Sequence, residues 1–130
     1  MLEVVSGLFI ASYDEVLSYN GNAFIINLSN RQISDAVNVS MNDTEDEVPD
    51  LLHLTIYIID LIKHYIQTTP VICACNQGIN RSAYVIASYL IVHCNVAPVE
   101  AIAKIKLINR QMGRNALTNR MFLHNLNLLS

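Results

Sequence analysis

The sequence contains no long uninterrupted apolar run. A membrane-spanning helix needs about 20 consecutive apolar residues, and the longest apolar stretches are interrupted by polar residues at 60, 63–64, 88, 93 and 95. The first seven residues carry no basic residue ahead of their apolar ones, so they lack the pattern of a secretory signal peptide. We therefore expect no membrane partner and an intracellular, chiefly cytoplasmic, location.

Positive charge is also scarce. Eight lysines and arginines stand against eleven aspartates and glutamates, which gives a formal net charge of −3. Such a protein lacks the broad basic field that binds nucleic acid or anionic lipid without sequence preference. Nucleic acid is therefore not an expected partner, and any bound anion must be held in a local pocket.

The chain has no internal repeat, no low-complexity tract and no linker rich in proline, glycine or serine. We therefore predict a single domain over residues 1–130, a length that suffices for a hydrophobic core. Hydrophobic residues make up 52% of the chain, which supplies that core and is also compatible with a homodimer. In an intracellular protein, Cys73, Cys75 and Cys94 are expected to be thiols rather than disulfides.

The expected secondary structure predicts an α/β fold. Short apolar runs bounded by turn residues indicate strands at 7–11, 23–28, 37–40 and 71–74. Helical patterns cover 14–19, 49 to about 67, 82 to about 93, 98–110 and 118–129. The second of these helices is apolar on most sides and is expected to be largely buried. We predict a central, mostly parallel sheet of about four to five strands, flanked by helices.

One strand-loop-helix segment carries chemistry. Cys75 follows a buried strand, Arg81 comes six residues later at the start of a helix, and Gly78 lies midway. Ligands of α/β folds bind at the carboxyl ends of strands, and a helix N-terminus offers free N–H groups to an anion. Gly78 permits a positive φ in a loop whose amides point into one concavity. The residues expected to bind an oxyanion in this way are Asn76, Gln77, Gly78, Ile79, Asn80 and Arg81.

Arg81 supplies a planar fork of donors that matches two oxygens of a tetrahedral oxyanion. The same positive environment favours the thiolate form of Cys75, which is the nucleophilic form. Ser82 is placed to hydrogen-bond the sulfur and to stabilise it as a leaving group in a second half-reaction. We therefore predict these three residues as catalytic.

Simpler interpretations of the cysteines compete with the catalytic one. A cysteine at the end of a buried strand is usually a small hydrophobic residue. Cys73 has the same explanation, with a reversible disulfide that protects the nucleophile as an alternative. Cys73, Cys75, His93 and Cys94 do not have the spacing of a structural zinc site. We expect no metal and no organic cofactor.

Residues 75–82, Cys-Asn-Gln-Gly-Ile-Asn-Arg-Ser, resemble the phosphate-binding loop of cysteine-based protein phosphatases, most closely the dual-specificity group. The resemblance covers nearly the whole chain in order. Residues 7–12 and 26–29 are similar to the family's first two strands, and 100–102 and 119–126 to its last two helices. It implies a phosphotyrosine-phosphatase-like fold and a minimal catalytic domain similar to small viral members. The nucleus and the virion therefore join the cytoplasm as expected locations.

The resemblance also implies a general acid. Family members carry an aspartate on a loop about thirty residues before the nucleophile; Asp43 matches that position, and Asp46 is the second choice. The acid would protonate the leaving oxygen and then deprotonate the water that hydrolyses phosphocysteine. The acidic stretch around them lacks the glycine that a calcium-binding loop requires.

Three positions depart from the family pattern. Ala74 stands where the family has a histidine that orders the loop, which predicts a less stabilised thiolate and slower chemistry at low pH. Gln77 and Asn80 stand where many members have smaller residues, so they are expected to narrow the pocket or to change what enters it.

The resemblance predicts an enzyme that removes phosphate from phosphotyrosine, phosphoserine and phosphothreonine in phosphorylated proteins through a phosphocysteine intermediate. Two alternatives stay open. An RNA 5′-phosphatase of the capping type has a similar loop over 78–81, although a more basic surface and a histidine before the cysteine are usual there. A phosphate-binding pseudophosphatase is suggested by Ala74, but the retained Cys75, Arg81 and Asp43 argue against it.

Overall fold

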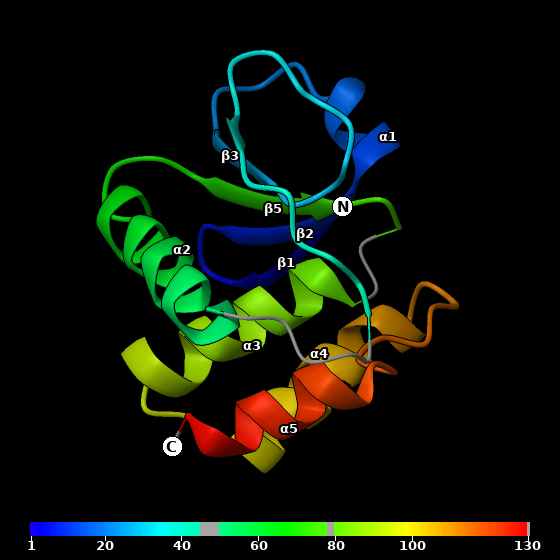
Figure 1. Cartoon of the computed structure of the whole chain (residues 1–130). Helices are drawn as coiled ribbons and strands as arrows, with labels where there is room; N and C mark the ends of the chain where they lie inside the picture. The colour runs from blue at the N-terminus through cyan, green and yellow to red at the C-terminus, as the bar shows by residue number, and fades with distance from the viewer. Residues whose placement is uncertain (45–49, 78–79, 130) are drawn as a thin grey trace.

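The computed structural model describes residues 1–44, 50–77 and 80–129 and contains a five-stranded sheet (Figure 1). The strands are β1 (Leu2–Val5), β2 (Leu8–Ser12), β3 (Phe24–Asn27), β4 (Val37–Asn38) and β5 (Val71–Cys75). The helices are α1 (Tyr13–Leu17), α2 (Leu51–Tyr65), α3 (Arg81–His93), α4 (Pro98–Arg110) and α5 (Arg120–Leu128). The predicted α/β fold is confirmed.

The sheet is parallel except at one edge. Its strands lie in the order β1-β2-β5-β3-β4, and the central β5 pairs in parallel with β2 and β3. The sequence interpretation missed β1, which pairs antiparallel with β2. The two strands are joined by a tight turn at Ser6 and Gly7, where Gly7 has a φ of 84°. This short edge strand depends on pairing with β2, which the pattern of four residues does not reveal.

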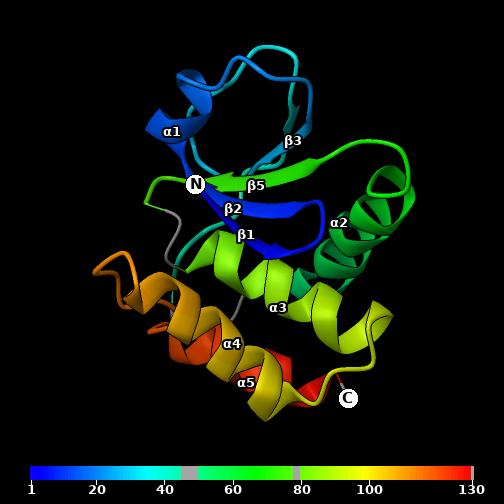
Figure 2. The same ribbon diagram turned by 180° about the vertical axis from the view of Figure 1, so that it is seen from behind.

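Side chains along β5 alternate between the two faces of the sheet. Val71, Cys73 and Cys75 belong to the large apolar cluster that includes residues of α2, α3, α4 and α5. Ile72 and Ala74 belong to a smaller cluster with residues of α1. Figures 1 and 2 show the same division, with α1 on one side of the sheet and the other helices opposite. Cys75 and the residue before it therefore face different layers.

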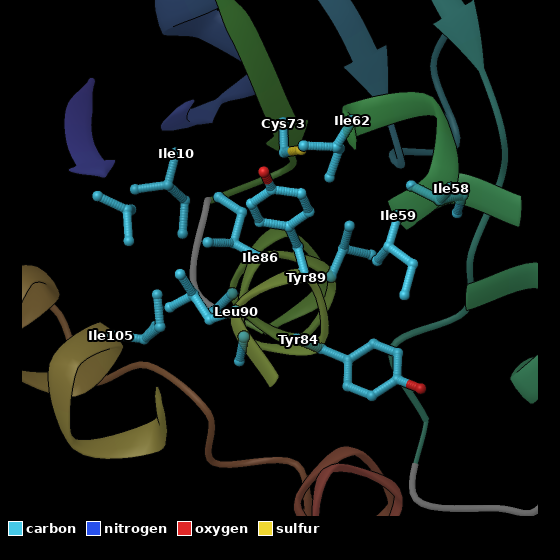
Figure 3. Packing of buried hydrophobic residues seen from close by; sticks show 14 of the residues in the cluster. Ile10, Ile58, Ile59, Ile62, Cys73, Tyr84, Ile86, Tyr89, Leu90 and Ile105 are labelled. Carbon is cyan, nitrogen blue, oxygen red and sulfur yellow. The ribbon is translucent and has the colours of Figure 1, made fainter. Parts of the chain in front are cut away.

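Helix α3 is the central helix of the large layer, and every residue from Arg81 to Ile91 is buried. Tyr84 stacks on Phe122 of α5 with ring centroids 4.5 Å apart, and its hydroxyl lies 2.8 Å from that of Thr55 in α2. Figure 3 shows the apolar side chains of α2 and α3 packed together in this cluster. The start of α3 is thereby fixed against both the sheet and the neighbouring helices.

Helix α2 differs from its prediction. It begins at Leu51, and the predicted start at Pro49 lies outside the described residues. It is amphipathic rather than largely buried, because Leu52, Ile56 and Tyr57 are 47%, 42% and 54% exposed. An all-apolar pattern does not distinguish the face that packs on α3 from the one left outside. None of the described helices is long and apolar enough to cross a membrane.

Candidate active site

Cys75 ends β5, and its sulfur faces the first turn of α3. The backbone N–H of Ser82 donates to Sγ over 3.5 Å. N–H groups in a first helical turn have no partner within the helix, and the helix dipole places partial positive charge there. The Ser82 hydroxyl, which we expected to contact the sulfur, is buried and has no hydrogen-bond partner among the described residues. The contact to sulfur therefore comes from the Ser82 backbone.

Arg81 is a buried cation. Its side chain is 7% exposed, and Nη1 donates to the carbonyl oxygens of Leu28 over 3.5 Å and Met41 over 3.2 Å. Leu28 directly follows β3 and Met41 lies three residues after β4, so the segments that follow two strands hold the guanidinium in place. Within the described chain no ion pair includes Arg81, and its buried Nε has no hydrogen-bond partner. A buried cation of this kind is suited to an anionic ligand.

Asp43 is held by two side-chain amides. Its Oδ2 accepts a hydrogen bond from Asn80 Nδ2 at 3.1 Å, and its Oδ1 accepts one from Asn119 Nδ2 at 2.7 Å. The first partner directly precedes Arg81, and the second is the N-cap of α5. The carboxylate is therefore tied to two segments that are distant from it in sequence.

One cavity of about 440 Å³ joins these groups. It is lined by Asp43, Cys75, Asn76, Gln77, Asn80, Arg81, Asn115 and Thr118. Among the described lining residues the charged side chains are one arginine and one aspartate, and the other polar side chains are amides and a hydroxyl. The lining thus combines a thiol, a cation and a carboxyl group within a space large enough for a phosphorylated side chain.

Most of the predicted site residues meet in this cavity. Gly78, Ile79 and Asp46 lie outside the described residues. Asn80, which we expected to narrow the pocket, turns its amide towards Asp43 and Thr118. The side chains of Asn76 and Gln77 are exposed at its rim.

The sequence interpretation did not identify Asn115, Thr118 and Asn119. These residues belong to the connection between α4 and α5, about forty positions after the nucleophile candidate in the chain. An asparagine ahead of an amphipathic run is a signal for a helix N-cap, and Asn119 does cap α5 by accepting from the N–H of Phe122. No comparable pattern distinguishes the other two from ordinary loop residues.

The structure argues against the redox alternative for Cys73. This thiol is 0% exposed, and burial together with the nearby Cys75 raises its pKa well above the usual range. Because the thiolate is the form that undergoes disulfide exchange, such a thiol is poorly reactive. The described residues also contain no group of three or more histidine, cysteine, aspartate or glutamate side chains able to hold a metal ion.

Ala74 occupies a tightly packed position. It is 0% exposed, and in the ladder between β2 and β5 it lies opposite Ala11, which is also 0% exposed. Val16, Ile33 and Ile72 complete the buried part of the small cluster on this face. Two neighbouring alanines leave little room for the imidazole ring of a histidine.

We expect Ala74→His to reduce the free energy of unfolding by about 1–3 kcal/mol, because the imidazole overpacks the cluster under α1. Urea unfolding followed by circular dichroism measures the change. Ala103→His on the exposed face of α4 is the matched control, with an expected cost below about 0.7 kcal/mol. Equal losses in the two variants would show that the Ala74 environment can accommodate a histidine.

No protein-family model and no curated protein sequence matches this chain. Solved structures do. Human DUSP28 superposes with a TM-score of 0.81 at 21% identity, over 99% of this chain and 94% of that chain. A mouse dual specificity phosphatase complexed with zinc tungstate superposes with a TM-score of 0.81 at 22% identity, over 98% of this chain and 84% of that chain.

A viral protein is similar as well. OH1 from the Orf virus, described as a tyrosine phosphatase with triple substrate specificity, superposes with a TM-score of 0.74 at 14% identity, over 97% of this chain and 83% of that chain. Sequence identities this low establish a shared fold. The chain therefore has the fold of the small dual-specificity phosphatases.

Proposed function

We propose that residues 1–130 form one catalytic domain that hydrolyses phosphate monoesters on proteins through a phosphocysteine intermediate. The observation that carries this proposal is the buried guanidinium of Arg81, which has no ionic partner in the described chain and lines the same cavity as Cys75. A buried cation that forms no ion pair among the described residues is suited to a phosphate dianion. The thiol in the same pocket supplies the nucleophile.

The first half-reaction transfers phosphate to the protein. The Cys75 thiolate attacks phosphorus, an S–P bond forms and the P–O bond to the leaving group breaks. The electron pair of that bond goes to the leaving oxygen, which takes a proton from the carboxyl group of Asp43. Arg81 and the amides of the loop hold the equatorial oxygens, where charge concentrates in the transition state.

The second half-reaction releases phosphate. The Asp43 carboxylate, now deprotonated, takes a proton from a water molecule whose oxygen attacks phosphorus, and the S–P bond breaks. Its electron pair returns to sulfur as the thiolate, which the N–H of Ser82 stabilises. Inorganic phosphate leaves, and Asp43 is again protonated for the next cycle.

Phosphoproteins are the proposed substrates. The similar mouse structure holds tungstate, a tetrahedral oxyanion like phosphate, and the Orf virus relative is described as having triple substrate specificity. We propose that phosphotyrosine, phosphoserine and phosphothreonine all enter the cavity of this chain. With a net charge of −3, the chain has no general attraction for an RNA backbone.

The test is hydrolysis of phenyl phosphate and of phosphopeptides across pH 5 to 8. Asp43→Ala should lower kcat about 10²-fold or more, because no proton reaches the leaving oxygen. Alanine is preferred to asparagine because an introduced amide would set one N–H donor against another at Asn80 or Asn119. Asp14→Ala, at an exposed carboxylate of α1, is the control and should leave kcat unchanged.

Two outcomes would contradict the proposal. Binding of vanadate without any turnover would favour a phosphate-binding pseudophosphatase and would make Ala74 the first residue to change. Faster release of phosphate from 5′-triphosphorylated RNA than from phosphopeptides would favour the capping-type alternative.

A further inference from the structure

The carboxylate of Asp43 is held by two side-chain amides, one on each oxygen. Asn80 donates to Oδ2 at 3.1 Å and Asn119 donates to Oδ1 at 2.7 Å. We name this pair the amide clamp. Its two members come from the start of α3 and the start of α5, so the clamp joins three segments of the chain at one side of the cavity.

Asn119 is the more tightly fixed member of the clamp. Its side chain is buried, and its Oδ1 accepts from the N–H of Phe122 at 3.2 Å, which caps α5. Its Nδ2 donates both to Asp43 and to the carbonyl oxygen of Thr44 at 2.9 Å. Because the cap occupies the oxygen, the nitrogen end must point towards the Asp43 segment. Helix α5 therefore sets the position of the carboxylate.

Asn80 is oriented in the same way from the other side. Its Oδ1 accepts from the N–H of Thr118 at 2.8 Å and from the Thr118 hydroxyl at 3.3 Å. Its Nδ2 is then directed towards Asp43. A serine at this position would be too short to link the two partners.

We propose that Asn119 is a positioning residue for the proton transfer by Asp43, an inference that rests on the proposed phosphatase function. It touches no reacting atom. Asn119 Nδ2 donates to Oδ1 of Asp43 and to the carbonyl oxygen of the neighbouring Thr44. These two hydrogen bonds hold the carboxyl group at the place where the leaving oxygen needs a proton. Without the Asn119 amide, Asp43 still has a carboxyl group that can donate a proton, but that group loses the orientation that makes the proton transfer efficient.

The dependence of the rate on the leaving group separates this role from a structural one. Phenyl phosphate has a poor leaving group that needs protonation, whereas 2,4-dinitrophenyl phosphate has a good one that leaves as an anion. The parameter kcat/KM reports the steps up to departure of the leaving group and leaves out the later hydrolysis of phosphocysteine, in which Asp43 acts as a base. Loss of acid catalysis therefore lowers kcat/KM for the first substrate only, while damage to the nucleophile, to phosphate binding or to folding lowers it for both.

The test uses Asn119→Ser and Asn119→Ala. Serine retains an oxygen that caps α5 but cannot reach Asp43, so it separates the clamp from the cap. For both variants we expect kcat/KM on phenyl phosphate to fall about 10- to 100-fold, with KM within about twofold of wild type. On 2,4-dinitrophenyl phosphate we expect kcat/KM within about twofold of wild type. In an Asp43→Ala background, Asn119→Ser should cause no further loss.

Asn127→Ala is the matched control, because this exposed amide lies on the same helix and donates only to the Leu123 carbonyl among the described residues. It should leave both rates unchanged. An equal fall in kcat/KM on the two substrates would overturn the positioning role. So would a further loss of kcat/KM when Asn119→Ser is added to Asp43→Ala. Absence of turnover of 2,4-dinitrophenyl phosphate by the wild type would overturn the proposed function itself, and the inference with it.

Discussion

Cys75→Ser is expected to reduce phosphatase turnover by about 10⁴-fold or more, the loss typical of removing a catalytic nucleophile. A serine hydroxyl is a far weaker nucleophile than a cysteine thiolate. The change removes no buried volume of consequence, and the N–H of Ser82 keeps an acceptor. Vanadate should therefore still bind, and the midpoint of thermal unfolding should stay close to that of wild type.

The other two cysteines provide the controls for this experiment. Cys73→Ala removes a buried thiol on the same strand and face, and Cys94→Ser removes an exposed one. Both variants should retain turnover, and wild type should transfer radioactive phosphate from substrate to Cys75 alone in rapid-quench experiments. Full activity in Cys75→Ser would exclude the phosphocysteine mechanism.

Arg81→Lys is expected to lower kcat/KM about 10²- to 10³-fold, although it retains the positive charge. A lysine ammonium presents a point charge, whereas the guanidinium holds the Leu28 and Met41 carbonyls with Nη1 and still has donors for an oxyanion. Lysine can satisfy those carbonyls or the phosphate, but not both in one geometry. Steady-state kinetics on a phosphopeptide measure the loss of turnover, and vanadate titration measures the loss of oxyanion binding.

Arg110→Lys, at an exposed position on α4, is the matched control and should leave kcat/KM unchanged. Thermal unfolding of the Arg81 variant is needed as well, because the arginine side chain also connects the segments that follow β3 and β4. A lysine variant with wild-type kcat/KM would show that charge alone suffices and that the planar fork is not used.

The sequence by itself predicts the elements that carry the candidate nucleophile and cation. The buried run that ends near Cys75 and the apolar helix that starts near Arg81 are long local patterns, and their order predicts a parallel sheet with a ligand site at its carboxyl edge. The structure places both residues in one cavity because consecutive elements position them. Local periodicity also explains why the α/β fold was predicted while the short edge strand β1 was not.

Asp43 is an intermediate case. No local pattern separates it from the acidic residues that follow, and only the resemblance to a family singled it out. Its hydrogen bonds to Asn80 and Asn119 join segments far apart in the chain. These contacts depend on how α3 and α5 pack, through pairs such as Tyr84 and Phe122.

The sequence therefore determined the fold class, the strand-loop-helix segment and the residue types available for chemistry. Tertiary structure alone decided that the connection between α4 and α5 contributes Asn115, Thr118 and Asn119 to the site, and that Ala74 is enclosed beneath α1. The physical reason is that periodicity and capping report contacts within a few residues, whereas the hydrogen bonds of a pocket wall form only after whole helices have packed.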